Sequence, residues 1–561
     1  MLRTFKRPSA LSKYHFSTSR PTLKTLHFQN SLSKTLVPFT PLTSPLSFYV
    51  CGPTVYSHSH LGHARAYTTT DMIRRVLRDY FNYEVQFCMN ITDVDDKIIH
   101  KSHEQGKEVR QVAKEFEKEF MDRMQDLAVE PPDFVPRVSE YVQEVVQFVQ
   151  RLEKKGFAYE ANGSVYFDVK EYLQRGNEYP KLNIAAKEQL EKLLEEGEGV
   201  LSNGELSGEK KSPQDFVLWK KSKENEPFWE SKWGNGRPGW HIECSVMSHE
   251  VFQRYPIDIH AGGEDLKFPH HDNEIAQSEA HHGCDKWVNY WIHIGHLHID
   301  KQKMSKSLKN FIKIKEFLKL YSSRQIRFLF LLQKWNKIMN FDPKVSMAEA
   351  IAKDSQFSEF FKQARAIVRN YEIHQTSQKF NMEDKQLDSF LRDTKERVHH
   401  HLCNNIDTPS VINELSSLII KTNSYMKSGD NELKAPLILS ISRFILKISQ
   451  CLGLINDDPF GFDSTQELTD ETSIEPFVQA TVDLRDRIKK LVFKSNIKKE
   501  LFEELDKIRD EDLARLGIRL EDSTTGGSST WIKEDPDVLL SNIKERKLGK
   551  KQKTNKAKKP S

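Results

Sequence analysis

Apolar and polar positions in the first hundred residues predict short strands separated by a helix. Residues 46–51 form a short apolar and aromatic run that ends at a Gly-Pro pair, which predicts a strand stopped by a loop. Thr70 and Asp71 are expected to cap an amphipathic helix, and residues 83–89 predict the next strand. Because strand, helix and strand in this order form a βαβ unit, we expect a parallel sheet.

The rest of the chain is mainly helical in pattern. Residues 107–155 are charged and helical, whereas residues 156–240 are irregular and rich in Gly, Lys and Glu. We interpret about 130–240 as an insertion into the sheet domain, with a mobile loop near 195–211. Further elements are expected as a strand from 257 and a helix over 311–333. Beyond residue 345 the apolar spacing predicts a bundle of helices near 346–371, 384–402, 408–427, 434–452 and 474–518.

Composition excludes several classes of protein. No stretch approaches about 18 uninterrupted apolar residues, so we expect no transmembrane helix and no membrane partner. Six cysteines in 561 residues do not form a disulfide scaffold, which favours a reducing compartment. Aromatic residues make up 10% of the chain, which is enough for packed cores and excludes a wholly disordered chain.

Both ends of the chain are basic. Residues 1–34 contain seven Lys or Arg and no acidic residue, which is typical of a mitochondrial transit peptide over residues 1–22. We therefore expect a protein of the mitochondrial matrix, with an additional cytoplasmic form left open. The alternative for this end is an ordinary basic terminus. The tail 544–561 carries nine Lys or Arg and one Glu, and it either binds phosphate groups or is merely solvated.

A histidine-rich cluster follows the first predicted strand. His60, Gly62 and His63 lie before the predicted helix, and a helix N-terminus attracts phosphate through its free N–H groups and dipole. Glycine allows a phosphate or a flat ring to approach the backbone, and imidazoles at i and i+3 can donate to one anion. Taken alone, the cluster is also consistent with a metal site or with no function.

A lysine-rich cluster, Lys-Met-Ser-Lys-Ser, occupies residues 303–307 after an apolar run over 290–299. Two lysines that flank small residues can stabilise the charge that develops on a pyrophosphate. An isolated run of this kind is more often a solvated loop. It indicates a phosphate-binding function only together with the histidine cluster far upstream.

The two clusters together resemble the signature motifs of class I aminoacyl-tRNA synthetases, with Leu61 where isoleucine is usual. Four further blocks are similar to the cysteinyl-tRNA synthetase family: YVCGPTVY at 49–56, NITDVDDKII at 90–99, GWHIECS at 239–245 and FPHHDNEIAQ at 268–277. Two departures occur. The family's Lys-Ile-Ile-Lys block ends here in His100, and the long insertion of animal cytosolic members is absent, which favours a bacterial or organellar form.

The resemblance implies a Rossmann-like α/β catalytic domain with a parallel sheet and an insertion, followed by an α-helical tRNA-binding bundle. In residue numbers, the transit peptide covers 1–22, the catalytic domain 23–345 and the helical region that binds tRNA and its anticodon 346–520. A small anticodon-binding end with the Lys-rich tail covers 521–561.

The resemblance also implies the reaction. L-cysteine would be activated by ATP, accompanied by Mg²⁺, to cysteinyl-adenylate and then transferred to tRNA(Cys), with AMP and pyrophosphate released by a monomeric enzyme. The catalytic residues implied are His60, His63, Lys303 and Lys306, and the residues that bind ATP are His60, Gly62, His63 and Lys306.

A zinc site is implied as well. Cysteine, histidine and glutamate are zinc ligands, and His270 and Glu274 share one face if their segment is helical. Spacing alone leaves buried thiols as an alternative, because no CxxC pair is present. The resemblance selects Cys51, Cys244, His270 and Glu274, and not His271, for one Zn²⁺ that recognises the substrate thiol, which the hydroxyl of serine imitates poorly. The cysteine pocket would be lined by Gly52, Thr92, Trp240, His260 and His270.

Two alternatives from other functional classes stay open. One is an ATP-dependent ligase that joins cysteine to an amino sugar, and the other is a non-catalytic RNA-binding paralogue. A ligase of the first kind would lack a full tRNA-binding half, and a paralogue of the second kind would have lost ligands or lysines. The helical stretch 346–520 and the intact motifs therefore favour the synthetase.

Overall fold

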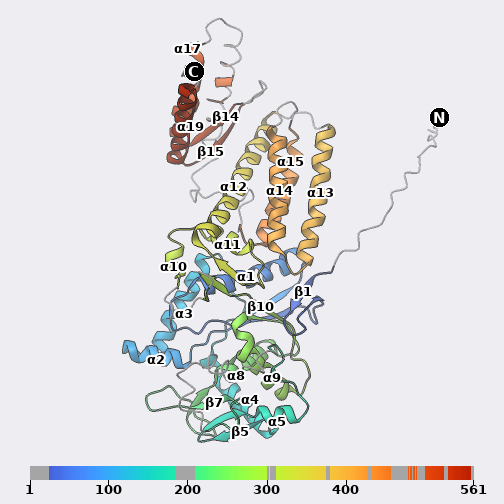
Figure 1. Ribbon diagram of the computed structural model, residues 1–561, viewed down its shortest axis with the longest axis vertical. Helices are drawn as coiled ribbons and strands as arrows, with labels where there is room; N and C mark the ends of the chain where they lie inside the picture. The colour runs from blue at the N-terminus through green and yellow to red at the C-terminus, as the bar shows by residue number, and fades with distance from the viewer. Residues whose placement is uncertain are drawn as a thin grey trace, which may run out of the picture.

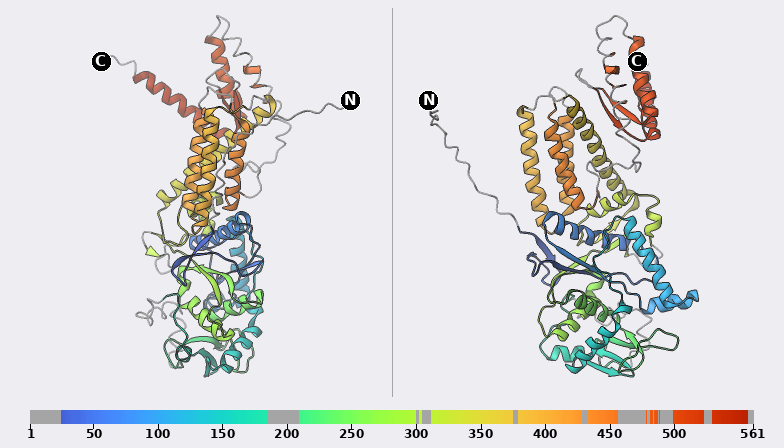
Figure 2. Two further views of the ribbon diagram at one scale, coloured as in Figure 1. Left: turned by 90° about the vertical axis from the view of Figure 1, so that its right-hand side faces the viewer. Right: turned by 180° about the vertical axis from the view of Figure 1, so that it is seen from behind.

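The structure is a computed structural model that describes residues 25–183, 209–299, 302–303, 311–374, 379–427, 433–455, 478, 481–482, 484–486, 488, 499–522 and 529–556. The expected transit peptide, most of the expected loop near 195–211 and residues 304–307 of the lysine cluster lie outside this range. The described part is elongated, with an α/β unit at one end, a helical bundle in the middle and a small C-terminal unit at the other end (Figures 1 and 2).

The central sheet is parallel, as predicted, with the order β10-β9-β3-β4. Its strands are β3 (Leu46–Val50), β4 (Val85–Met89), β9 (Ile257–Gly263) and β10 (Val288–Ile294). Because β3 pairs with β4 on one side and with β9 on the other, the strand order reverses at β3. In open α/β sheets, ligands bind in the crevice outside the carboxyl ends of the strands at such a point.

The helix between β3 and β4 begins much earlier than predicted. Helix α1 spans Leu61–Arg75 and continues into a π-helical turn, η1 (Val76–Tyr80). Thr70 lies inside the helix, where its hydroxyl donates to the carbonyl of Tyr67 at 3.1 Å instead of capping. A hydroxyl satisfied by its own helix is compatible with a helix interior, so the expected cap at Thr70 and Asp71 was wrong.

The insertion contains a regular sheet that the sequence pattern did not reveal. Its strands run antiparallel in the order β5-β6-β7-β8 and are short: β5 (Ala158–Ala161), β6 (Ser164–Phe167), β7 (Phe216–Lys221) and β8 (Gly236–Pro238). All four residues of β6 are buried, so this strand has no polar face and shows no alternation of apolar and polar positions.

Helices surround the two sheets. They are α2 (Asp96–Gln105), α3 (Val109–Asp126), α4 (Val142–Lys154), α5 (Val169–Gln174), α8 (Trp240–Phe252) and α9 (Asp272–His282). The segment 311–333 forms two helices instead of one, α10 (Ile314–Phe317) and α11 (Ser323–Leu331), because Ser322 caps α11 by accepting from the Gln325 N–H at 3.2 Å. Four short strands complete this half: β1 (His27–Asn30) with β2 (Thr35–Pro38), and β11 (Leu297–Ile299) with β12 (Gln302–Lys303).

The predicted bundle is present. It consists of α12 (Pro343–His374), α13 (Met382–Cys403), α14 (Thr408–Lys427) and α15 (Ala435–Cys451). α12 begins just after β13 (Met339–Phe341), which pairs with β11 in the α/β half. None of the described helices is both long and apolar enough to cross a membrane.

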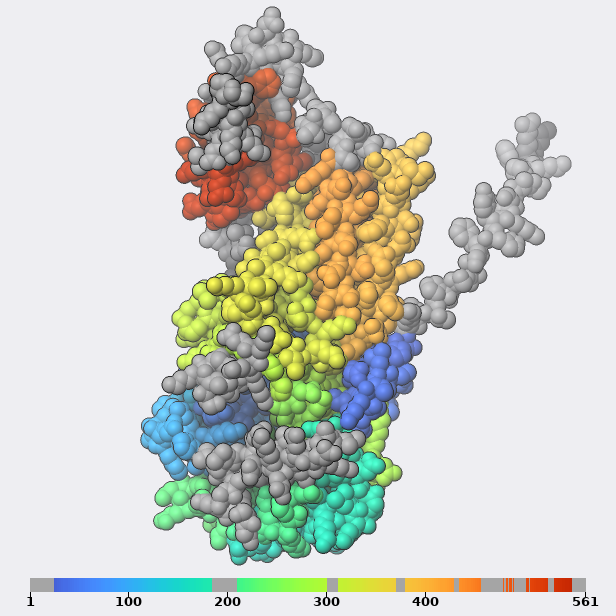
Figure 3. Space-filling model, in the orientation of Figure 1, coloured from blue at the N-terminus to red at the C-terminus, as the bar shows by residue number. Residues whose placement is uncertain are grey.

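The C-terminal unit departs from the single helix expected over 474–518. Its described residues form α17 (Lys499–Lys507), the π-helical turn η6 (Ile508–Asp512), α18 (Leu513–Arg515), the hairpin β14 (Ile518–Glu521) and β15 (Thr530–Lys533), and α19 (Pro536–Lys556). Arg369 of α12 lies 3.6 Å from the ring centre of Trp531 and donates to its carbonyl at 2.6 Å. In Figure 3 the yellow α12 leads from the α/β half to the red C-terminal unit.

A buried ion cluster joins the two halves. The carboxylate of Asp71, 1% exposed, accepts from Arg74 at 3.1 Å, from Arg75 at 2.9 Å and from Arg327 of α11 at 2.9 Å. Burial alone raises the pKa of Asp71, but the three guanidinium groups outweigh it and lower the pKa. Arg327 also donates to the carbonyls of Ala128, at 3.0 Å, and Leu452, at 3.5 Å, so this one side chain of α11 contacts α1, the turn after α3 and the end of α15.

Asp71→Asn is expected to destabilise the protein by about 3–5 kcal/mol, because it removes the buried charge that all three guanidinium groups contact and leaves Arg74 and Arg75 only the partly exposed Glu130. Unfolding in urea, followed by circular dichroism, measures the loss. The matched control is Asp126→Asn, which removes an ion pair to Arg123 at 2.9 Å whose carboxylate is 43% exposed, and which is expected to cost less than about 1 kcal/mol. Equal losses for the two variants would contradict a structural role for the cluster.

Candidate active site

Four side chains that could hold a metal ion converge at the carboxyl end of β3. They are Cys51, His270, His271 and Glu274, whose ligand atoms all lie within 4.8 Å of one another and which are all buried. The Cys51 sulfur is 3.5 Å from Nε2 of His270 and 3.4 Å from Nε2 of His271. His270 Nε2 lies 3.0 Å from Glu274 Oε1, in agreement with the predicted i, i+4 face.

Cys244 belongs to the same cluster. It lies on α8, and its sulfur is 3.6 Å from that of Cys51. The structure thus brings together the four residues expected as ligands, from the end of β3, from α8, from the π-helical turn η5 (Lys267–His271) and from the start of α9. It also adds His271, which the sequence had set aside in favour of its neighbour.

The electrostatics of the cluster favour a charged thiolate and suit a metal. Burial raises the pKa of Cys244, but a hydrogen bond from Cys51 and the charge of His270 outweigh it and lower the pKa to about 6. For His270, burial lowers the pKa, but Glu274 and Cys244 outweigh it and raise the pKa to about 10. Thiolate, imidazole and carboxylate are the donors that zinc prefers in proteins, so the donor set fits Zn²⁺.

A chain of buried histidines supports the cluster from behind. His260 Nε2 lies 2.9 Å from the second oxygen of Glu274. His271 Nδ1 lies 2.7 Å from His293 Nε2, and His293 Nδ1 lies 2.8 Å from the hydroxyl of Ser31. Such contacts fix the orientation of the side chains at a metal site. Sequence reasoning missed His293 and Ser31 because nothing in their local pattern marks them, and only the fold brings β1 and β10 together.

The residues predicted to line the cysteine pocket lie around the cluster. The Trp240 ring stacks on His270 with 4.6 Å between ring centres, and the hydroxyl of Thr92 donates to Glu243 at 3.1 Å. The Gly52 N–H donates to the Asn90 side chain at 2.9 Å. A Cβ at Gly52 would lie 1.6 Å from the backbone oxygen of Asn90, so no other residue fits there without a shift of the backbone.

The histidine motif forms the start of α1. His60 is the N-cap residue, its backbone N–H lies 3.4 Å from His63 Nδ1, and the two rings stack with their centres 3.8 Å apart. Gly62 lies in the first turn between them. Both imidazoles therefore lie at the positive end of the helix dipole, where an anion is stabilised.

The segment that follows the lysine motif pairs with the histidine motif. Lys313 forms an antiparallel bridge with His60, the Leu61 N–H donates to the Ile312 carbonyl at 2.9 Å, and the Phe311 ring centre lies 4.7 Å from that of His60. The backbone of Lys303 lies in β12, but its side chain and all of Lys306 lie outside the described residues. Residues 311–313, which follow the lysine motif in the chain, thus lie beside the histidines.

A carboxylate that the sequence did not single out holds the histidine loop. Glu119 of α3 accepts from the N–H of Ser59 at 3.1 Å and from its hydroxyl at 2.9 Å. It also lies 3.7 Å from His58. These contacts position the backbone immediately before His60.

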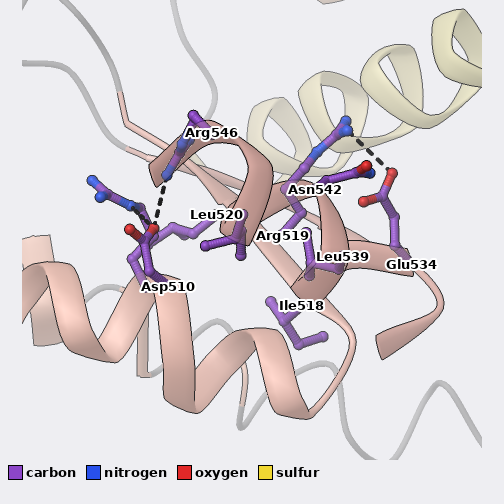
Figure 4. A pocket seen from close by; sticks show the side chains of 10 residues that line it. Asp510, Ile518, Arg519, Leu520, Glu534, Leu539, Asn542 and Arg546 are labelled. Carbon is purple, nitrogen blue, oxygen red and sulfur yellow. Dashed lines mark hydrogen bonds and ion pairs between the residues drawn. The ribbon is translucent and has the colours of Figure 1, made fainter. Parts of the chain in front are cut away.

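A separate pocket lies in the C-terminal unit, at the opposite end of the molecule (Figures 1 and 4). Its apolar side is formed by Ile518, Leu520 and Leu539. Its arginines are engaged in ion pairs, such as Arg546 with Asp510 at 3.0 Å, so this pocket offers no free charge comparable to the cluster in the α/β half.

Comparisons with known proteins agree on one family. Residues 39–351 match the profile described as the catalytic domain of class I tRNA synthetases (C). The chain is 41% identical to the cytoplasmic cysteine–tRNA ligase of Dictyostelium discoideum, over 93% of this chain and 79% of that protein. It is 41% identical to the cysteine–tRNA ligase of Encephalitozoon cuniculi over 90% and 98%, and 35% identical to the cytoplasmic enzyme of Homo sapiens over 92% and 83%.

Solved structures support the fold alone. A Mycobacterium tuberculosis methionyl-tRNA synthetase in complex with methionyl-adenylate matches with a TM-score of 0.57 at 14% identity, over 73% of this chain and 92% of that one. The Rossmann-like α/β half and the helical region inferred from the resemblance are thus confirmed as a fold class.

The comparisons correct one prediction. The relatives from Dictyostelium discoideum and Homo sapiens are named cytoplasmic, which contradicts the mitochondrial location inferred from residues 1–22 and the organellar form inferred with it. The inference failed because an acid-free stretch of Lys, Arg, Ser and Thr is also the composition of an ordinary solvated terminus.

Proposed function

The chain belongs to the cysteine–tRNA ligases, which are class I aminoacyl-tRNA synthetases, and on this premise we propose that it activates L-cysteine with ATP and transfers it to tRNA(Cys). The observation that carries the proposal is the convergence of two thiols, an imidazole and a carboxylate at the switch point of the sheet, beside a phosphate-binding helix start. Neither the amino-sugar ligase nor the non-catalytic paralogue has support, because the relatives that bear the name of the tRNA ligase match nearly the whole chain.

One Zn²⁺ would be held by Cys51, Cys244, His270 and Glu274. When bound, it would supply an electrophilic position for the substrate thiolate, which the hydroxyl of serine would occupy poorly. Trp240 and Thr92 would line the sides of the pocket, and the absence of a side chain at Gly52 lets the backbone oxygen of Asn90 pack against it. His260 keeps Glu274 in place through its hydrogen bond.

The chemistry needs positioning and charge stabilisation, because no covalent enzyme intermediate is formed. The cysteine carboxylate attacks the α-phosphate of ATP, and pyrophosphate leaves with its Mg²⁺. His60 and His63 would contact the phosphates at the start of α1, with Gly62 allowing close approach. Lys303 and Lys306 would stabilise the charge on the departing pyrophosphate.

The transfer step requires the tRNA to reach this site from the other half of the molecule. The helical region 346–520 and the end 521–561 would hold the tRNA and its anticodon. Support comes from the length of the bundle and from the basic residues of α19. We propose that a monomer carries all parts of the site.

Aminoacylation of tRNA(Cys) by the purified chain is expected with cysteine and ATP, and serine is expected to be rejected by a factor of about 10⁴ or more. The reason is that a site built for a specific interaction of the substrate strongly rejects an analogue that lacks it. The measurement is the rate of charging with each radiolabelled amino acid. Equal charging with serine, or none with cysteine, would overturn the proposed function.

Cys244→Ser is expected to lose zinc and to weaken cysteine binding while ATP binding stays nearly unchanged. The substitution removes one of the four proposed ligands and keeps nearly the same volume. Elemental analysis measures the zinc, and calorimetry measures the two substrates. Cys88→Ser serves as the control, because Cys88 is buried on β4 and is not among the proposed ligands. Wild-type zinc content in Cys244→Ser would contradict the ligand assignment.

Lys306→Ala is expected to lower kcat for cysteine-dependent pyrophosphate exchange by about 10²–10³, with a smaller change in the KM for ATP. The lysine is proposed to act on charge that develops only in the transition state. Lys315→Ala, on the exposed start of α10, is the control and is expected to retain wild-type kinetics. A change confined to KM would reassign Lys306 to ground-state binding.

A further inference from the structure

Lys97 lies next to Trp240, one of the residues proposed to line the cysteine pocket. It is the second residue of α2, and Asp95 caps this helix by accepting from the Lys97 backbone N–H at 2.8 Å. A cation in the first turn of a helix is opposed by the helix dipole. Its position therefore does not serve the stability of α2.

The ammonium group of Lys97 lies over two aromatic rings. It is 5.6 Å from the ring centre of Trp240 and 5.9 Å from that of Tyr56. Trp240 in turn stacks on His270 of the metal-binding cluster. The Trp240 indole therefore lies between the charge of Lys97 and His270, one of the proposed ligands.

The side chain keeps its hydrogen-bonding capacity. Among the described residues, no ion pair or hydrogen bond involves the Lys97 ammonium group, and the side chain is exposed. The neighbouring Asp96 is not its partner, because that carboxylate binds Lys220 at 2.9 Å and also Arg237. Burial raises the pKa of Asp95 and the charge of Lys97 opposes this shift, so Asp95 is the carboxylate nearest in effect, but it forms no ion pair with the ammonium. Contacts with ring faces at nearly 6 Å are weak, so the three N–H donors of the ammonium are available to a ligand.

The start of α2 is itself held in place. Lys220 of β7 and Arg237 of β8 both bind Asp96, which fixes the first turn of the helix to the sheet of the insertion. The backbone that carries Lys97 is therefore fixed next to Trp240, and only the lysine side chain has to be ordered when it binds an anion.

We propose that the Lys97 ammonium binds the oxyanion at the reacting end of the substrates, either the carboxylate of cysteine or the α-phosphate that this carboxylate attacks. The inference rests on the proposed function. It makes Lys97 a substrate-binding residue in addition to the residues of the two signature motifs and the metal cluster. Both the carboxylate and the α-phosphate are oxyanions, and in cysteinyl-adenylate the two are joined in one mixed anhydride.

Lys97→Met tests this inference, because methionine keeps an apolar stem on Tyr56 and Trp240 and removes the charge. Calorimetry is carried out on the zinc-loaded full chain with three ligands: cysteine, cysteamine, which has the thiol and the amine but no carboxylate, and ATP. If the carboxylate is the ligand, cysteine binding weakens about 10- to 100-fold and cysteamine binding does not change. If the α-phosphate is the ligand, ATP binding weakens instead. Lys97→Arg is expected to restore most of the lost affinity.

The matched control is Lys101→Met, one turn further along α2, where the lysine pairs with Glu104 at 2.8 Å. It is expected to bind all three ligands as the wild type does. Lys97→Met with the same three affinities as this control would overturn the inference while leaving the proposed function intact. A wild-type chain that binds neither cysteine nor ATP would overturn the proposed function itself.

Discussion

The buried carboxylate of Asp71 holds together the helices that carry the two halves of the site, and through Arg327 it is linked to the end of the bundle. Three guanidinium groups share it out of contact with water, and a buried charge of this kind is tolerated only when its partners are complete. Asp71 lies on α1, the helix that begins with the histidine motif, and Arg327 lies on α11, shortly after the lysine motif. One buried contact thus fixes the helices that follow both motifs and ties them to the end of α15.

The site is assembled at the point where the sheet reverses its order. Its donors come from three segments that are distant in the chain, and each segment ends or begins there: β3 ends before Cys51, α8 begins before Cys244 and α9 begins before Glu274. At the ends of strands and helices the backbone is not fully hydrogen-bonded within the element. Polar side chains can therefore converge there without disrupting the sheet. The histidines behind them keep the donors oriented.

The sequence correctly predicted those strands and helices whose local pattern of apolar and polar residues agrees with their tertiary environment. The strand before Cys51, the parallel pairing with β4, the four helices of the bundle and the shared face of His270 and Glu274 follow from periodicity of two or 3.6 residues. It failed where tertiary contacts decide. Thr70 is satisfied inside α1, β6 is buried on both faces, and His271, His293 and Glu119 acquire their contacts only through the fold. The assignment of ligands and ATP contacts came from a resemblance of whole motifs, since Cys51 and Cys244 carry no metal signature of their own.

Helix α12 fixes the distance and the rotation between the α/β half and the C-terminal unit. It is 32 residues long, or about 48 Å, and it leaves the α/β half at Pro343 without an intervening loop. Near its C-terminal end, Arg369 contacts the ring of Trp531 in the C-terminal hairpin and donates a hydrogen bond to its carbonyl. The helix therefore rigidly connects the α/β half at one end to the C-terminal unit at the other. A single residue inserted between Pro343 and Arg369 would turn everything beyond it by about 100° and shift it by about 1.5 Å. An insertion in a surface loop changes little beyond the loop, whereas an insertion in α12 would rotate the C-terminal unit relative to the α/β half.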